Sequence, residues 1–314
     1  MEERKTTTVK VLAEHLELKQ LTGDKEALSR LITLPNTNRP GLELAGFFDY
    51  AEKKRIVILG KKENAYLKKL DDQLQELSFD FLTSDETPLL LITSGKPIPK
   101  VLEKIANEKN FPVFVTKRSS SDVMVDIVTF LDEVLAPTTN VHGGLMSVYG
   151  RGVLIIGGSG MGKSELALEL INRGHALVAD DRVDISRVKE TIIGTAPELL
   201  KGMLEIRGIG IIDVRSMFGH HAFLEKIPVD FVVELEKWDD NKEYTRAGIE
   251  SDAFYEALDV EIPHLVFPVR EGRNMSVLVE SAVRDFILKQ SGINTAAQFD
   301  ERVMNFILMQ NKES

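Results

Sequence analysis

A glycine-rich stretch that ends in a lysine and a serine, GGSGMGKS, contains the residue types that bind phosphate. Glycines let successive backbone N–H groups curl around phosphate oxygens, and a helix starting there adds the positive end of its dipole. The lysine would pair with the β and γ phosphates of a nucleotide, and the serine hydroxyl would ligate Mg²⁺. The predicted ATP- and phosphate-binding residues are Gly157, Gly158, Ser159, Gly160, Met161, Gly162, Lys163 and Ser164.

The segments on either side of this stretch have the character that a P-loop requires. Residues 153–156 form an apolar run that leads directly into the glycines, and leucines and isoleucine recur at helical spacing after Ser164. Gly174 stands where a helix commonly ends. Strand, G-x-x-x-x-G-K-S and helix together predict an ATP-binding P-loop. The N-K-x-D motif of a GTPase does not occur, and residues 229–240 match the acidic strand of a motor ATPase only loosely.

Two adjacent carboxylates, Asp180 and Asp181, follow the apolar strand after the P-loop helix. Ligands of open parallel sheets gather at the carboxyl ends of strands. One carboxylate there would bind Mg²⁺ or its waters, and the other would accept a proton from an attacking hydroxyl. Neighbouring side chains leave a strand on opposite sides unless the strand has already broken. The alternative is therefore that one carboxylate is catalytic while the other is solvated or caps the chain.

Two further groups of charged residues follow. Glu205 and Arg207 share a strand face by period-two geometry, and they would either hold metal and phosphate or form a surface salt pair. Arg270 and Arg273 flank a glycine just before a predicted helix, and guanidinium groups suit phosphate oxygens. Basic loops are also commonly solvated. His142, in VHGG, reads by pattern alone as a packed or solvent-exposed histidine.

The helices and strands expected around these residues indicate an α/β protein of two domains. Apolar runs at 56–59, 89–93 and 112–116 alternate with helical stretches, which is typical of βαβ units and a largely parallel sheet. A helix capped near Ser119 runs to about residue 135, and a Pro-containing break follows it. We therefore predict an N-terminal α/β domain over residues 1–135, of unclear assembly or regulatory role, and a P-loop catalytic domain over residues 136–314.

Composition limits the function classes. The 314 residues are 43% hydrophobic, which is enough for a substantial core. The net charge of −10 argues against a nucleic-acid partner. The sequence has no cysteine, which suits a reducing cytoplasm, and no apolar run approaches the length of a membrane span. The residues alone thus predict a cytoplasmic, ATP-dependent phosphotransferase with no membrane partner.

The combined motifs resemble those of the HPr kinase/phosphorylase family. GGSGMGKS with GHALVADD, then LEIRGIGIIDV, then PVREGRN occur at the spacings of that family, most densely over residues 138–290. The resemblance implies a C-terminal kinase domain with a core like that of the nucleotide-dependent carboxykinases. It implies a serine protein kinase and phosphorylase whose substrate is HPr, the small phosphocarrier of bacterial sugar uptake, in carbon catabolite repression. Inorganic phosphate and pyrophosphate would take part in the reverse reaction, and the assembly would be an allosteric homohexamer.

Individual roles also come from the resemblance. His142, Lys163, Asp181 and Arg246 match active-site positions, and Ser164 and Glu205 match the ligands of Mg²⁺ or Mn²⁺. Residues 204–213 match a stretch needed in both directions, and residues 267–272 match a stretch tied to dephosphorylation. Asp180, Arg207, Arg270 and Arg273 would support the reaction. Two rival classes remain open, a small-molecule kinase related to the carboxykinases and a nucleotide-sensing regulator without transfer chemistry.

Overall fold

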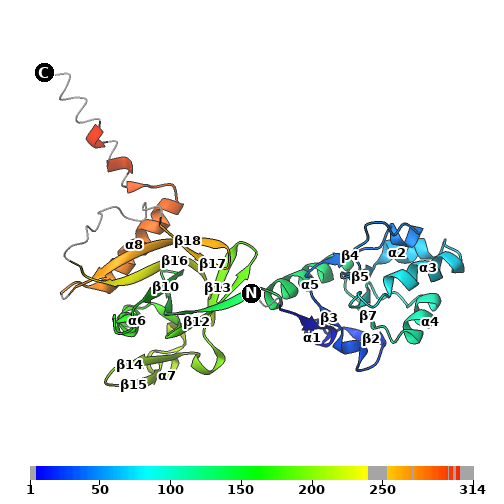
Figure 1. Ribbon diagram of the computed structural model, residues 1–314, viewed down its shortest axis with the longest axis horizontal. Helices are drawn as coiled ribbons and strands as arrows, with labels where there is room; N and C mark the ends of the chain where they lie inside the picture. The colour runs from blue at the N-terminus through cyan, green and yellow to red at the C-terminus, as the bar shows by residue number, and fades with distance from the viewer. Residues whose placement is uncertain (1–4, 240–252, 271, 296, 300–301, 305–314) are drawn as a thin grey trace. The chain divides into compact units, whose positions relative to one another are not determined.

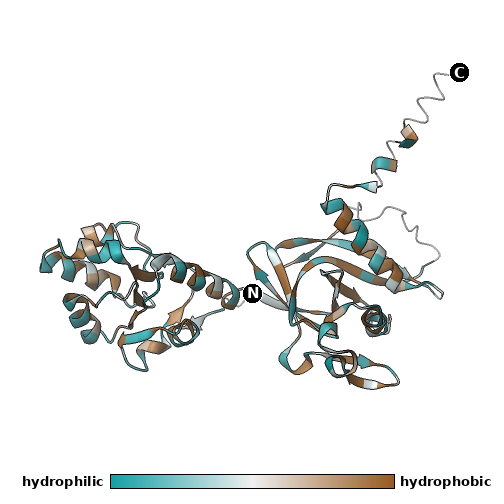
Figure 2. Ribbon diagram, turned by 180° about the vertical axis from the view of Figure 1, so that it is seen from behind, coloured by the Kyte–Doolittle hydropathy of each residue, from teal (hydrophilic) through white to brown (hydrophobic). Residues whose placement is uncertain are grey.

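The computed structural model describes residues 5–239, 253–270, 272–295, 297–299 and 302–304. The chain divides into two compact units, Met1–Pro137 and Thr138–Ser314 (Figure 1). The strands at the centre of each unit are largely apolar, as Figure 2 shows. Among the described helices, none joins the length and the apolar character needed to span a bilayer.

An open, mostly parallel sheet lies at the centre of the first unit, with strand order β2-β7-β6-β5-β4. Strands β4 to β7 are parallel, and β2 is antiparallel to β7. Strands buried on both faces read as continuous apolar runs, which is why the sequence revealed β5, β6 and β7. The predicted α/β fold with a largely parallel sheet is confirmed here. The strands are β2 (Lys19–Thr22), β4 (Thr37–Asn38), β5 (Ile56–Leu59), β6 (Leu90–Ile92) and β7 (Val113–Val115).

Helices cover both faces of this sheet. One buried cluster joins α1 and α5 to one set of strand side chains, and a second joins α2, α3 and α4 to the alternate set. The short strands β1 (Thr7–Thr8) and β3 (Leu31–Ile32) pair separately. The remaining elements are α1 (Val9–His15), η1 (Ala27–Ser29), η2 (Glu43–Ala45), α2 (Lys61–Leu67), α3 (Asp72–Leu82), α4 (Lys100–Glu108) and α5 (Ser120–Val134).

The second unit is built on a mixed sheet with the order β11-β9-β10-β16-β13-β12-β8; β18 also pairs with β16, and β17 pairs with β18. Strands β10, β16 and β18 are parallel neighbours, so their carboxyl ends lie at one edge. The strands are β8 (Thr138–His142), β9 (Gly144–Val148), β10 (Arg151–Gly157), β11 (Ala176–Ala179), β12 (Arg182–Val188), β13 (Thr191–Thr195), β16 (Lys226–Lys237), β17 (Phe254–Ala257) and β18 (Val260–Val269).

One apolar cluster fixes the elements that surround the P-loop. Leu166 and Leu170 of α6, Leu204 of β14 and Val279 of α8 are buried together against β10 and β16. The helix that follows the P-loop and the hairpin that carries Glu205 therefore share one core. The elements on this side are α6 (Lys163–Asn172), η3 (Glu198–Leu200), β14 (Met203–Ile206), β15 (Gly210–Asp213), α7 (Val214–Phe218), η4 (His220–Ala222) and α8 (Met275–Gln290).

A charged network ties α8 to the end of α6. The Glu280 carboxylate, with a side chain only 10% exposed, accepts hydrogen bonds from Arg173 Nε at 2.9 Å and from His175 Nε2 at 2.9 Å. These bonds, the Arg173 bond foremost, lower the pKa of Glu280 from 4.5 to about 2. Charge-assisted bonds are stronger than neutral ones, so this contact holds the carboxyl-terminal end of the P-loop helix in place.

We predict that Glu280→Gln lowers the free energy of unfolding at neutral pH by about 1–3 kcal/mol, because it weakens a buried charge-assisted contact. The pKa of Glu280 is depressed in the fold, so its stabilisation is complete above pH 4.5 and is lost as pH falls towards 2. Urea denaturation of wild type and variant across this range should show the difference shrinking in acid. Asp285→Asn on the same helix, whose side chain is 35% exposed, is the control and should change stability little.

Candidate active site

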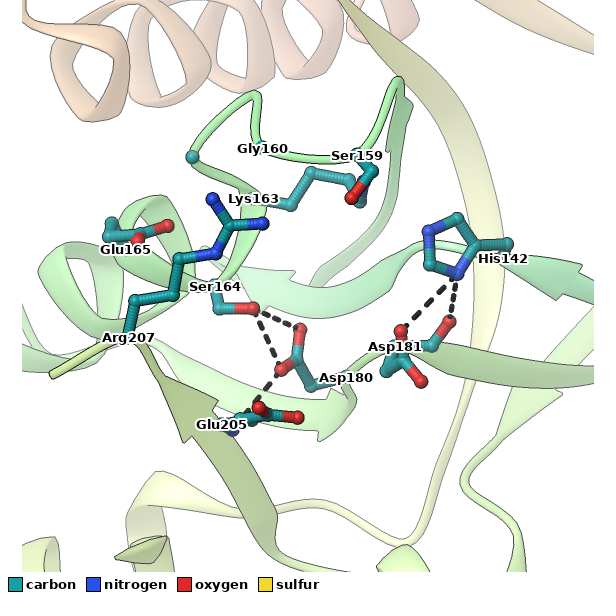
Figure 3. Close-up of a pocket in the computed structure, with 11 residues that line it drawn as sticks. His142, Ser159, Gly160, Lys163, Ser164, Glu165, Asp180, Asp181, Glu205 and Arg207 are labelled. Atoms are coloured by element: carbon teal, nitrogen blue, oxygen red, sulfur yellow. Dashed lines mark hydrogen bonds and ion pairs between the residues drawn. The ribbon is translucent and has the colours of Figure 1, made fainter. Parts of the chain in front are cut away.

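The P-loop connects the carboxyl end of β10 to the first turn of α6 (Figure 3). Gly160 and Gly162 have φ values of +80° and +81°, a left-handed conformation that residues with a Cβ rarely adopt. The ammonium group of Lys163 donates to the carbonyl oxygens of Gly157 at 2.9 Å and of Gly158 at 3.1 Å. The lysine therefore lies back across the loop, within reach of whatever occupies it.

A pocket of about 240 Å³ opens beside the loop. Five of the eight predicted phosphate-binding residues line it: Ser159, Gly160, Gly162, Lys163 and Ser164. Met161 instead packs against the apolar cluster beneath α6, and it anchors the loop. Glu165 also lines the pocket and was not among the residues predicted from the sequence. The P-loop pattern leaves that position open, and its place in the first turn of the helix, next to Ser164, was the available signal.

The chain reverses between Asp180 and Arg182. Arg182 N donates to Asp180 O at 2.7 Å, and Asp181 between them has a φ of +64°. This three-residue turn has the features of a γ-turn with positive φ, which is rare and strained. The strand is broken at this point, so adjacent side chains need not alternate. Both Asp180 and Asp181 consequently line the pocket.

The two carboxylates differ in their surroundings. Asp180 is 5% exposed, and its oxygens accept from the Ser164 hydroxyl at 2.9 and 3.2 Å and from Glu205 N at 3.4 Å. Burial raises the pKa of Asp180, an effect that the Ser164 hydrogen bond opposes. The Asp181 side chain is 68% exposed and open to a substrate. Asp180 is thus a buried hydrogen-bond acceptor, whereas Asp181 is exposed in the pocket.

His142 reaches this site through strand pairing. The β8–β12 register places His142 opposite Arg182, next to Asp181. His142 Nδ1 lies 2.9 Å from Asp181 O and 3.3 Å from Asp181 Oδ1. Because a carbonyl oxygen only accepts, Nδ1 carries the proton in this contact. His142 is 60% exposed, as one of the two pattern-based alternatives expected, and it also lines the pocket, which the pattern did not indicate.

The β14–β15 hairpin supplies another wall. Glu205 and Arg207 both line the pocket. The Arg207 guanidinium lies close to the P-loop, since a Cβ placed on Gly160 would be 3.4 Å from its Nη1. This placement favours metal and phosphate contacts over a surface salt pair, the alternative that period-two geometry left open. Figure 3 shows Glu205 beside Asp180 and Arg207 beside the loop.

Two other predicted arginines, Arg270 and Arg273, do not line this pocket. Arg270 stacks over the Trp238 ring at 5.2 Å, and Arg273 Nη1 donates to Pro268 O at 3.3 Å. Both contacts stabilise the chain around the end of β18. Arg246 lies outside the described residues.

Oxygen donors that suit Mg²⁺ meet at one side of the pocket. They are the Ser164 hydroxyl and the carboxylates of Asp180 and Glu205. Within the described ranges, no three His, Asp or Glu side chains are grouped so that they could hold a metal ion by themselves. Mg²⁺ that is shared with substrate phosphates takes only one or two carboxylates and keeps several waters, so this donor set fits it.

Comparisons with known proteins agree with the motifs. The domain described as HPr Serine kinase N terminus matches residues 7–131, and the HPr Serine kinase C-terminal domain matches residues 133–303. A Bacillus cytotoxicus protein named HPr kinase/phosphorylase is 41% identical over 97% of this chain and 98% of its own length. The chain belongs to the HPr kinase/phosphorylase family. The resemblance drawn from the P-loop, the GHALVADD stretch and the hairpin is therefore confirmed.

Other members of the family are similarly related. The HPr kinase/phosphorylase of Exiguobacterium sibiricum is 44% identical over 94% of this chain and 95% of its own length. Among solved structures, the Hpr(Ser) kinase/phosphatase from Coxiella burnetii is 34% identical, covers 51% of this chain and 98% of that chain, and aligns with a TM-score of 0.46.

We predict that Asp180→Asn raises the melting temperature of the metal-free protein at neutral pH. The pKa of Asp180 is raised by burial, so the folded chain holds the proton more tightly than the unfolded chain, and stability falls as pH rises through that pKa. An amide carries no such charge and still accepts from Ser164. Thermal unfolding at several pH values measures the effect.

The control for this prediction is Asp181→Asn, which changes the exposed neighbour and should leave the melting temperature nearly unchanged. A less stable Asp180→Asn variant at neutral pH would contradict the prediction. The same variant should need more Mg²⁺ to reach half-maximal activity, because a carboxylate next to the metal donors is lost.

Proposed function

We propose that this pocket transfers the γ-phosphate of ATP to a serine hydroxyl of HPr, and that it also cleaves phosphoseryl-HPr with inorganic phosphate. The observation that carries the proposal is the exposed Asp181 carboxylate, which lines the same pocket as the P-loop in a chain of the HPr kinase/phosphorylase family. A hydroxyl acceptor and a triphosphate tail could therefore meet within one cavity.

In the forward direction, the backbone of the P-loop receives the β and γ phosphates. The Lys163 ammonium moves from the carbonyls of Gly157 and Gly158 to the phosphate oxygens, because these carry the larger negative charge. Asp181 accepts the proton of the serine hydroxyl as its oxygen attacks the γ-phosphorus. Arg207, close to the loop, offsets the charge that develops on the phosphoryl group.

In the reverse direction, an oxygen of inorganic phosphate attacks the phosphorus of phosphoserine. The bond from phosphorus to the serine oxygen breaks, and pyrophosphate forms. Asp181, now protonated, donates to the leaving serine oxygen, so one carboxylate serves both directions by microscopic reversibility. His142 Nδ1–H, bonded to Asp181 O and close to Oδ1, orients the carboxylate.

Ser164, Glu205 and Asp180 would hold the divalent cation, Mg²⁺ or Mn²⁺, which when bound neutralises charge on the phosphate oxygens. Arg246 is assigned an active-site role on the family resemblance, and Arg270 and Arg273 are assigned supporting contacts with phosphate or substrate. The homohexamer stays an expectation from the family resemblance, and the cytoplasmic location and the boundary after residue 135 stay predictions.

Asp181→Asn should reduce both the kinase and the phosphorolysis rates by about 10²–10⁴-fold, the usual contribution of a general acid or base. Nucleotide affinity should stay unchanged, because Asp181 is absent from the P-loop. Initial rates in both directions and equilibrium binding of ATP measure these effects. Asp184→Asn, an acid three residues further on that pairs with Arg182 and does not line the pocket, is the matched control. Near-normal turnover of the Asp181 variant in either direction would refute its role.

The substrate is tested with γ-labelled ATP and purified HPr, followed by addition of inorganic phosphate. Acid-stable label on a serine that is then released as pyrophosphate supports the proposal. Label that appears on a small molecule would instead indicate a metabolite kinase. Nucleotide binding without any transfer would indicate a sensor.

A further inference from the structure

Two isoleucines on the β14–β15 hairpin are exposed beside the pocket. Ile209 is 70% exposed and Ile211 is 72% exposed. Single exposed apolar residues are common on protein surfaces and need no explanation. These two lie within the segment that also carries the pocket residues Glu205 and Arg207, and this placement gives them significance.

The hairpin register defines the direction of Ile211. Leu204 pairs with Ile212, and Glu205 pairs with Ile211. Directly opposed residues of an antiparallel pair project from the same face, with Cβ atoms about 4.5–5.5 Å apart. Leu204 and Ile212 pack into the core beneath the hairpin, so Glu205 and Ile211 share the opposite face. Because Glu205 lines the pocket, Ile211 lies at its rim.

Ile209 lies in the turn at the tip of the hairpin, two residues after Arg207 and two before Ile211 in the sequence. Ile209 N donates to Ile206 O at 3.1 Å across a turn in which Gly208 has a φ of +84°. Glycine permits this conformation, and the turn carries Arg207 on one side and Ile209 on the other. Ile206 is buried, so the base of the turn is anchored in the core while its tip is exposed.

We propose that Ile209 and Ile211 form an apolar seat, defined by these two side chains, for the protein that brings the serine to Asp181. This inference rests on the proposed function. The pocket of about 240 Å³ admits a phosphate group and a side chain, but not a folded protein. The protein substrate must therefore rest on the rim, where burial of the two isoleucines against it supplies binding energy.

The seat touches neither the phosphates nor the reacting oxygen, so its residues position the substrate and are not catalytic. The same docked complex serves both directions of the reaction. Loss of the seat should therefore raise the KM for HPr and for phosphoseryl-HPr by similar factors. The kcat values and the affinity for nucleotide should remain close to those of wild type.

The test uses the full chain with Ile209→Thr and Ile211→Thr combined, and Ile211→Thr alone as a second variant. Threonine keeps β-branching and therefore suits the hairpin. We expect the double variant to raise the KM for both protein substrates about tenfold or more. Val125→Thr on α5, also β-branched and 64% exposed, is the matched control and should have no effect. Thermal unfolding and ATP binding show whether each variant is intact.

The outcomes separate this inference from the proposed function. If the wild-type chain does not phosphorylate HPr, the proposed function fails. If wild type does so and intact variants keep its KM, the seat is refuted while the function stands. A change in sedimentation that accompanies the variants would also overturn the inference, because the isoleucines would then join copies of this chain. A raised KM with unchanged sedimentation supports it.

Discussion

The hydrogen bond from the Ser164 hydroxyl to the buried Asp180 carboxylate is the contact on which the site depends. Asp180 also accepts from Glu205 N, so one carboxylate joins the P-loop helix, the end of β11 and the hairpin. A buried carboxylate without partners would be strongly disfavoured. Movements that separate these three segments are therefore opposed, and the walls of the pocket keep their spacing.

The strained backbone conformation of Asp181 is stabilised by the strands next to it. A non-glycine residue with positive φ in a tight turn costs about 1–3 kcal/mol and persists only where its surroundings over-determine it. Here the Asp181 carbonyl accepts from Gly143 N at 3.1 Å and from His142 Nδ1 at 2.9 Å. The β8–β12 pairing thus fixes the turn, and the turn buries the Asp180 carboxylate while it leaves that of Asp181 exposed in the pocket.

Local patterns were enough to predict some parts of the site and not others. The P-loop could be predicted because its strand, glycines and helix follow one another directly in the sequence. The parallel strands of the first unit were likewise visible as apolar runs. The contact between His142 and Asp181 depends on pairing between strands that are distant in sequence. No local period reports such a register, so by pattern alone His142 read as packed or solvated.

The positions of the arginines were also not predictable from local sequence patterns. Arg270 and Arg273 flank a glycine, as arginines of a phosphate-binding loop can. In the structure, however, Arg270 contacts the Trp238 ring and Arg273 donates to the Pro268 carbonyl oxygen. The sequence around Arg207 is equally compatible with an exposed strand residue, yet in the structure its guanidinium lies close to the P-loop. Side-chain chemistry thus defined the candidates, and the non-local packing of the hairpin and of β18 determines which of these three arginines lies beside the P-loop.

The balance of charge in the pocket explains why a divalent cation suits this chemistry. Among the described residues that line it, four carboxylates, Glu165, Asp180, Asp181 and Glu205, face the two cations Lys163 and Arg207. A triphosphate tail would bring further negative charge into a space where like charges repel strongly. Backbone amides at the start of α6 offset part of this repulsion. A cation on the Ser164 side would offset the rest and leave Asp181, on the opposite side, free to exchange its proton.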